Sequence, residues 1–102
     1  MDNFIRGISI PREERKVYAM ISAYILITIQ PGKTDKAIKD MKHIDNIAKI
    51  SIIAGEYDIV VRAQVKNLEE LLEVTDKLQM VEGVMKTTTQ IIEKEIALQS
   101  WD

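Results

Sequence analysis

The chain has 102 residues, which indicates a single domain with one hydrophobic core. A net charge of −2 argues against a nucleic-acid-binding surface, and the absence of cysteine excludes disulfides and thiolate metal sites. No apolar run approaches the ~18 residues of a membrane span, and the first residues lack the apolar core of a signal peptide, so we expect a cytoplasmic protein.

The first half of the chain has the pattern of a strand, a helix and a second strand. Residues 23–30 are rich in β-branched side chains and stop at the turn pair Pro31-Gly32. Thr34 is the expected N-cap of a helix that ends near Lys42 or His43, with an apolar stripe of Ala37, Ile38 and Met41. Residues 47–54 form the second predicted strand.

The second half repeats this order. Gly55-Glu56-Tyr57-Asp58 is a predicted turn, and a third strand begins at Ile59. Asn67 is the expected cap of a second helix, and a fourth strand covers residues 84–95. The helix has apolar or small residues at helical spacing, namely Leu68, Leu71, Leu72, Val74, Thr75 and Leu78.

Two strand–helix–strand units of nearly equal length indicate an internal duplication of a split βαβ motif. Joined by a hairpin, they predict a ferredoxin-like α+β fold, βαββαβ, with a four-stranded antiparallel sheet and both helices on one face.

The strand patterns also bear on the face of the sheet that lacks helices. Tyr24, Leu26 and Thr28 alternate with a row of isoleucines in the first strand, and Ile50 and Ile52 are expected to oppose Ile47 and Ile53 in the second. We interpret this second face as too apolar to be hydrated. It predicts a two-fold dimer in which two sheets pack together as a dimeric α+β barrel.

Two motifs carry a family resemblance. Gly55, Tyr57 and Asp58 match a Gly-x-Tyr-Asp pattern, and Gly83, Val84, Thr87 and Thr89 match Gly-Val-x-x-Thr-x-Thr after the second helix. In this order and spacing, residues 23–95 resemble the effector (RAM) domain of Lrp/AsnC, or feast/famine, transcriptional regulators.

The resemblance divides the chain into three parts. Residues 1–22 are similar to the linker strand of such regulators through Ile5, Gly7, Ile8 and Pro11, although the Tyr and Asp of that linker pattern are missing. Residues 23–95 are the ligand-binding and oligomerisation domain, and residues 96–102 are a C-terminal tail. No helix-turn-helix precedes the domain. The chain is either a stand-alone effector domain or a truncated regulator.

The turn at residues 55–58 has two interpretations. As an ordinary hairpin, it uses Gly55 and Asp58 only as turn formers. As a ligand loop, Gly55 lets a ligand approach backbone N–H groups while Asp58 offers a carboxylate to an ammonium group, a combination that suits an α-amino acid. The resemblance favours the ligand loop, with Glu56 at its variable position, and adds Tyr57 to the candidate site.

The threonine run Thr87-Thr88-Thr89 also has two interpretations. Its hydroxyls could bind a ligand, or the threonines could be present only because threonine is a good strand former. The resemblance implies that Thr87 and Thr89 lie near the effector pocket of an adjoining dimer, and Thr88 should face the other way. His43, the one histidine, has no partner pattern for a metal site or a catalytic pair. We therefore expect no catalytic residues, no metal and no cofactor.

The leading hypothesis is an amino-acid-sensing oligomerisation domain. The resemblance implies dimers that assemble into an octamer of four dimers, with an amino acid bound where dimers meet. It also implies a possible full-length Lrp/AsnC regulator as partner, without direct contact to nucleic acid or membrane. Two alternatives stay open: a small barrel enzyme of the monooxygenase or isomerase type using Tyr24, Tyr57 and Asp58, and a purely structural oligomerisation module.

Overall fold

The computed structural model describes residues 4–5, 8–9 and 20–99 of the chain. Two short antiparallel strands, β1 (Phe4–Ile5) and β2 (Ile8–Ser9), come first. Residues 1–3, 6–7 and 10–19 of the predicted N-terminal extension lie outside the described residues, as do residues 100–102 of the tail. The main body then consists of β3 (Ile21–Ile29), α2 (Thr34–Met41), β4 (Ile47–Ile52), β5 (Ile59–Val65), α3 (Leu68–Gln79) and β6 (Val84–Ile91).

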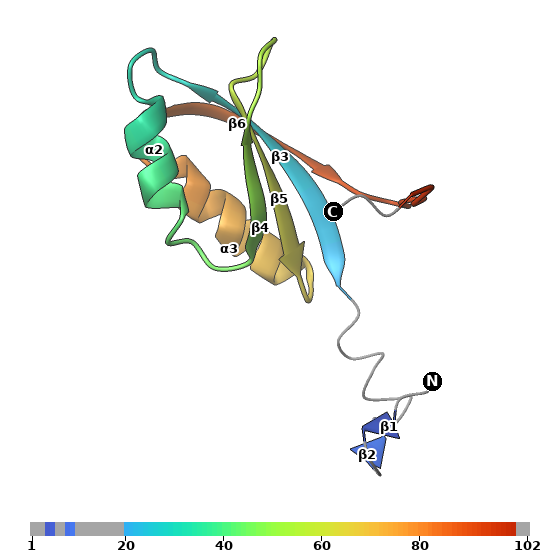
Figure 1. Ribbon diagram of the computed structural model, residues 1–102. Helices are drawn as coiled ribbons and strands as arrows, with labels where there is room; N and C mark the ends of the chain where they lie inside the picture. Colours follow the sequence, from blue (N-terminus) through green and yellow to red (C-terminus); the bar gives the residue numbers. More distant parts are fainter. Residues whose placement is uncertain (1–3, 6–7, 10–19, 100–102) are drawn as a thin grey trace.

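The four long strands form one antiparallel sheet in the order β4-β5-β3-β6. Both helices lie on the same side of this sheet, and the opposite side has no helix (Figure 1). We call the opposite side the open face. The predicted βαββαβ, ferredoxin-like α+β fold is confirmed.

The core lies between the sheet and the helices, and its pattern follows from strict alternation along the two central strands. In β5 every second residue from Ile59 to Val65 is buried, and in β3 the same holds from Ala23 to Ile29. The helices contribute five more buried side chains: Ala37, Met41, Leu71, Val74 and Leu78. Each large aliphatic side chain buried here contributes about 1.5–3 kcal/mol.

The start of α3 was predicted correctly, whereas the start of α2 was not. Asn67 Oδ1 accepts a hydrogen bond of 2.9 Å from the backbone N–H of Glu70, as an N-cap should. Thr34, however, is the first residue of α2 itself. The N-cap position is Lys33, whose carbonyl accepts the first helical bond, from Ala37 N–H at 2.9 Å, so no side chain caps this helix.

The predicted side-chain directions of β4 were wrong because the strand contains a bulge. Ile47 pairs with Ala63, but the next paired residue is Lys49, opposite Arg62, so Ala48 is the extra residue. The insertion shifts the alternation by one position. Ile47 therefore lies on the helix side together with Ile50 and Ile52, rather than opposing them.

The premise that the open face is too apolar to be hydrated is wrong, and the bulge contributes to this only by moving Ile47 to the helix side. The paired registers assign twelve residues to this face, and Leu26, Val60 and the ring of Tyr24 are its apolar part. The others are polar or charged: Ser22, Thr28, Lys49, Ser51, Arg62, Gln64, Lys86, Thr88 and Gln90.

Two further predictions need correction. The strand expected to reach Glu95 ends at Ile91, because Ile91 already pairs with Ala23 near the start of β3 and few partner residues remain beyond it. In α3, Leu68 and Leu72 belong to the predicted apolar stripe, yet their exposed fractions are 57% and 63%. Their side chains are not covered by the sheet and form an exposed apolar surface beside β6.

Candidate functional site

The loop between β4 and β5 contains the Gly55–Asp58 motif and extends beyond one end of the sheet (Figure 1). Three hydrogen bonds made by Asp58 hold the loop. Its backbone N–H donates to Ile27 O at 2.9 Å, its carbonyl accepts from Ile53 N–H at 3.0 Å, and its Oδ2 accepts from Ile29 N–H at 2.7 Å. The loop is therefore anchored to both β4 and the end of β3.

The four motif residues differ in their exposure. Gly55 has φ +146°, a conformation that residues with a side chain rarely adopt, although an added Cβ would meet nothing within 4 Å. Glu56 is exposed, whereas Tyr57 and Asp58 are half-buried. The motif thus combines a turn that requires glycine for its backbone with an Asp58 carboxylate that already has a structural partner.

The three threonines lie on two faces of the edge strand β6. Thr87 pairs with Ile27 and Thr89 with Ile25, so both lie on the helix side, and Thr87 Oγ1 accepts a hydrogen bond of 3.1 Å from Gln79 Nε2 of α3. Thr88 pairs with Leu26 on the open face. The predicted opposite direction of Thr88 is confirmed.

Thr89 lines a cavity of about 340 Å³ between α3 and β6. The exposed fraction of Ile91, which also lines it, is 53%, so this edge is apolar and accessible. We call this surface the α3–β6 edge; it is lined by Leu68, Leu71, Leu72, Thr75, Thr89 and Ile91.

Within one subunit the loop and the threonines remain apart. Ile27 of β3 pairs with Ile59 on one side and with Thr87 on the other, so two strand spacings, about 10 Å, separate the loop end of β5 from β6. The cavity lined by Thr89 contains none of the four loop residues. The two predicted halves of the site therefore do not form one pocket in a single chain.

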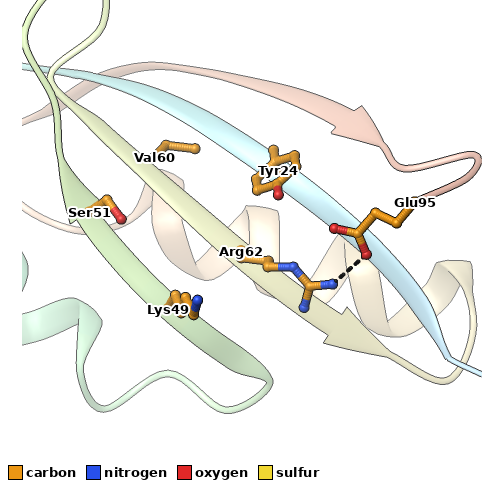
Figure 2. A pocket seen from close by; sticks show the side chains of 6 residues that line it. All are labelled: Tyr24, Lys49, Ser51, Val60, Arg62 and Glu95. Atoms are coloured by element: carbon orange, nitrogen blue, oxygen red, sulfur yellow. Dashed lines mark hydrogen bonds and ion pairs between the residues drawn. The ribbon is translucent and has the colours of Figure 1, made fainter. Parts of the chain in front are cut away.

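Sequence reasoning missed a polar cavity of about 470 Å³ on the open face. Figure 2 shows the Arg62 guanidinium directed toward Glu95, and Arg62 Nη2 donates to Glu95 Oε1 at 2.9 Å. This bond raises the pKa of Arg62 above its usual value. The cavity is lined by Tyr24, Lys49, Ser51, Val60, Arg62 and Glu95. In the sequence, the feature that could have indicated this cavity is Arg62, a charged residue within the apolar run of β5.

Comparison with known families gives a match over residues 22–101 to the Lrp/AsnC ligand binding domain. The chain belongs to this family. A related regulator is the HTH-type transcriptional regulator FL11 of Pyrococcus furiosus, 35% identical over 74 residues that cover 72% of this chain and 49% of the relative. The chain thus spans about half the length of the curated relatives it matches.

Solved structures give the same fold for this Lrp/AsnC domain. TTHA0845 from Thermus thermophilus superposes with a TM-score of 0.70 at 26% identity, covering 76% of this chain and 98% of that one. The feast or famine regulatory protein Rv3291c of M. tuberculosis, complexed with L-methionine, has a TM-score of 0.71 at 21% identity. That match covers 93% of this chain and 64% of the mycobacterial one.

The Lrp/AsnC domain does not bring the enzyme candidates together. Tyr24 pairs with Arg62 in the middle of β5 on the open face, whereas Tyr57 and Asp58 lie in the loop that precedes β5. His43 is exposed just after α2, and its backbone N–H donates to Asp40 O at 3.2 Å.

Residues 4–5, 8–9 and 20–99 contain no group of three His, Cys, Asp or Glu side chains that could hold a metal ion. Over the same ranges, no helix has the length and apolar content to cross a membrane.

Proposed function

We propose that this Lrp/AsnC domain is an amino-acid sensor that binds a small α-amino acid between dimers and controls their assembly. The observation that carries the proposal is the split site. Gly55–Asp58 and the threonines lie on separate surfaces of one chain, so a ligand that touches both must bridge subunits. A ligand at such a junction stabilises the assembly that contains it.

The chemistry of each half suits one part of an α-amino acid. Near Gly55 a ligand carboxylate can approach backbone N–H groups, and the Asp58 carboxylate can attract an ammonium group through the oxygen that Ile29 N–H does not use. Exposed Glu56 and half-buried Tyr57 flank these groups and tune selectivity. From the adjoining dimer, Thr87 and Thr89 supply hydroxyls, whereas the side chain of Thr88 lies on the opposite face and makes no such contact.

The proposed assembly is a homodimer that joins into an octamer of four dimers. The open face is the dimer surface, with half-buried Leu26 and Val60 at its centre and polar residues around them. Contacts between dimers use the α3–β6 edge, where Leu68, Leu72 and Ile91 are more than half exposed. Exposed apolar side chains grouped around one cavity are typical of surfaces that become covered on association.

The biological role follows from the relatives, which are named transcriptional regulators. We propose that the chain acts in regulation in the cytoplasm, not as an enzyme, and that it assembles with a full-length Lrp/AsnC regulator without contacting DNA itself. L-methionine in a structure of the same fold supports an amino acid as the ligand class.

A thermal-shift screen of the twenty amino acids tests this function. A ligand at ten times its Kd contributes about 1.4 kcal/mol, which raises the Tm of a domain of this size by roughly 5–10 °C. Asp58→Asn, which keeps an acceptor for Ile29 N–H, should fold and lose the response, whereas Asp45→Asn at an exposed turn position should keep it. No shift with any amino acid would instead favour a purely structural oligomerisation module.

A further inference from the structure

The cavity at the α3–β6 edge has an uncharged lining. The described residues that line it are three leucines, one isoleucine and two threonines, with no acidic, basic, amide or histidine side chain among them. The hydroxyl of Thr75 donates to Leu72 O at 2.9 Å within α3, so its proton is already bound inside the helix. Apart from Thr75, Thr89 is the one described lining residue with a polar side chain.

Thr89 connects this cavity to the proposed effector site. The effector contact uses the hydroxyls of Thr87 and Thr89 on the helix side of β6, and Thr89 also lines the cavity. Two positions along a strand correspond to about 7 Å, a span comparable to that of a small amino acid. A ligand whose polar groups contact these two threonines therefore lies directly beside the cavity.

An uncharged, largely apolar cavity discriminates between classes of amino acid side chain. A charged side chain that entered it would lose its water and gain no ionic partner from the described lining. An aliphatic or thioether side chain would instead be stabilised by burial of its apolar area. The carboxylates of Glu56 and Asp58 belong to the loop half of the site, where the ligand ammonium is expected, and neither residue lines the cavity.

The dimer contact proposed above gives the cavity its cover. Leu68, Leu72 and Ile91 are more than half exposed in one chain, and an adjoining dimer that packs on them closes the cavity. Left empty, a cavity of about 340 Å³ inside a packed contact costs free energy. A ligand side chain that fills it removes this cost and so favours the larger assembly.

We propose that the α3–β6 edge cavity binds the side chain of the effector, and that the effector is a medium-sized apolar amino acid such as leucine, isoleucine or methionine. This inference rests on the proposed function, since it requires an amino acid at Thr87 and Thr89. It goes beyond that function by naming the ligand class and by assigning Thr75, whose side chain lies in the lining, as a residue that determines specificity.

The test is calorimetric titration of the wild-type protein, in its native assembly, with a series of single amino acids. Leucine or methionine should bind at least about tenfold more tightly than asparagine or glutamine, which have a similar size but lose hydrogen bonds to water in the cavity. The same preference is expected over alanine, which leaves the cavity unfilled. Aspartate, glutamate and lysine should bind more weakly still.

Thr75→Leu tests the position of the ligand side chain. Thr75 is half-buried on α3, and leucine is a better helix former than threonine, so the variant should fold. The larger side chain occupies part of the cavity and should weaken leucine and methionine binding at least about tenfold, with alanine binding within about threefold of wild type. Thr34→Leu, the same change at the first residue of α2 and outside the cavity, should bind all ligands as wild type does.

The outcomes separate this inference from the proposed function. An amide or charged amino acid that binds as tightly as leucine and methionine, in a manner that Asp58→Asn abolishes, overturns the inference and leaves the sensor function standing. Equal losses for leucine and alanine in Thr75→Leu overturn it too, as does the same loss in Thr34→Leu. Absence of binding by every amino acid contradicts the inference and the sensor function together.

Discussion

The carboxylate of Asp58 accepts a hydrogen bond of 2.7 Å from the backbone N–H of Ile29, which lies 29 positions earlier in the chain. The bond joins the β4–β5 loop to the end of β3 and satisfies a donor of a residue whose side chain belongs to the core. The aspartate of the Gly-x-Tyr-Asp motif therefore has a structural role in one subunit, in addition to the ligand role that we propose between subunits.

Asp58→Ala should lower the free energy of unfolding by about 1–3 kcal/mol, because it leaves the Ile29 N–H without its acceptor. Asp58→Asn should cost less, since the amide oxygen can accept the same bond. Asp45→Ala, at an exposed position in the turn after α2, should change stability by less than about 0.5 kcal/mol. Urea unfolding measures all three, and equal stabilities for Asp58→Ala and Asp45→Ala would disprove the structural role.

Gly83→Ala should be more destabilising than Gly32→Ala, although both residues have positive φ, +98° and +86°. A Cβ on Gly83 would lie 2.6 Å from the Cβ of Lys33, close to that residue's backbone, whereas a Cβ on Gly32 meets nothing within 4 Å. We expect a loss of about 1 kcal/mol at Gly32 and about 2–4 kcal/mol at Gly83. Thermal unfolding compares the two, and similar losses would show that the contact with Lys33 relaxes freely.

Glu82 gives a prediction about pH. Ion pairs with Lys33 at 3.2 Å and Lys36 at 3.5 Å hold the pKa of the Glu82 carboxyl below its usual value of 4.5. A depressed pKa in the folded state means that the stabilisation is present above the unfolded pKa and is lost as pH falls through the folded one. The small stability difference between wild type and Glu82→Gln at neutral pH should therefore vanish in acid and in high salt.

The measurement for Glu82 is urea unfolding across pH at two salt concentrations. Glu73→Gln, an exposed position on α3, is the matched control and should follow wild type throughout. A wild-type advantage over Glu82→Gln that grew as pH fell would contradict the sign of the linkage.

Leu72→Lys tests the α3–β6 edge as a contact between dimers. Leu72 is 63% exposed in one chain, so the substitution should change the stability of the subunit by less than about 0.5 kcal/mol. It places a charge beside the cavity that Thr89 lines and should reduce the assembly to dimers in native mass spectrometry. Met80→Lys, at a more exposed site outside that cavity, should leave the assembly intact.

Much of the fold could be predicted because its determinants are local. The alternation in β5 and the Asn67 cap of α3 were correct, since each depends on residues that are neighbours in the chain. The bulge at Ala48 could not be read from β4, because a bulge is defined only by the pairing with Arg62 and Ala63 of another strand. It decided which residues of β4 occupy the open face and moved Ile47 to the helix side. The polar residues that the other three strands place on the open face follow from their own pairing.

The candidate site likewise has features that the sequence predicted and contacts that it did not. The motif residues were found by their order in the chain, and the strand parity of Thr88 followed from alternation alone. The hydrogen bond between Ile29 N–H and Asp58 joins residues 29 positions apart. The ion pair between Arg62 and Glu95 joins residues 33 positions apart. Such contacts depend on how the strands are ordered in the sheet, so no spacing in the sequence indicated them.

Native mass spectrometry of the wild-type protein, with and without each of the twenty amino acids, tests the split effector site most directly. We predict that at least one amino acid shifts the distribution from dimers toward octamers and is carried in the larger assembly, and that Asp58→Asn abolishes this shift. An unchanged distribution with no bound amino acid in any of the twenty spectra would contradict the sensor function.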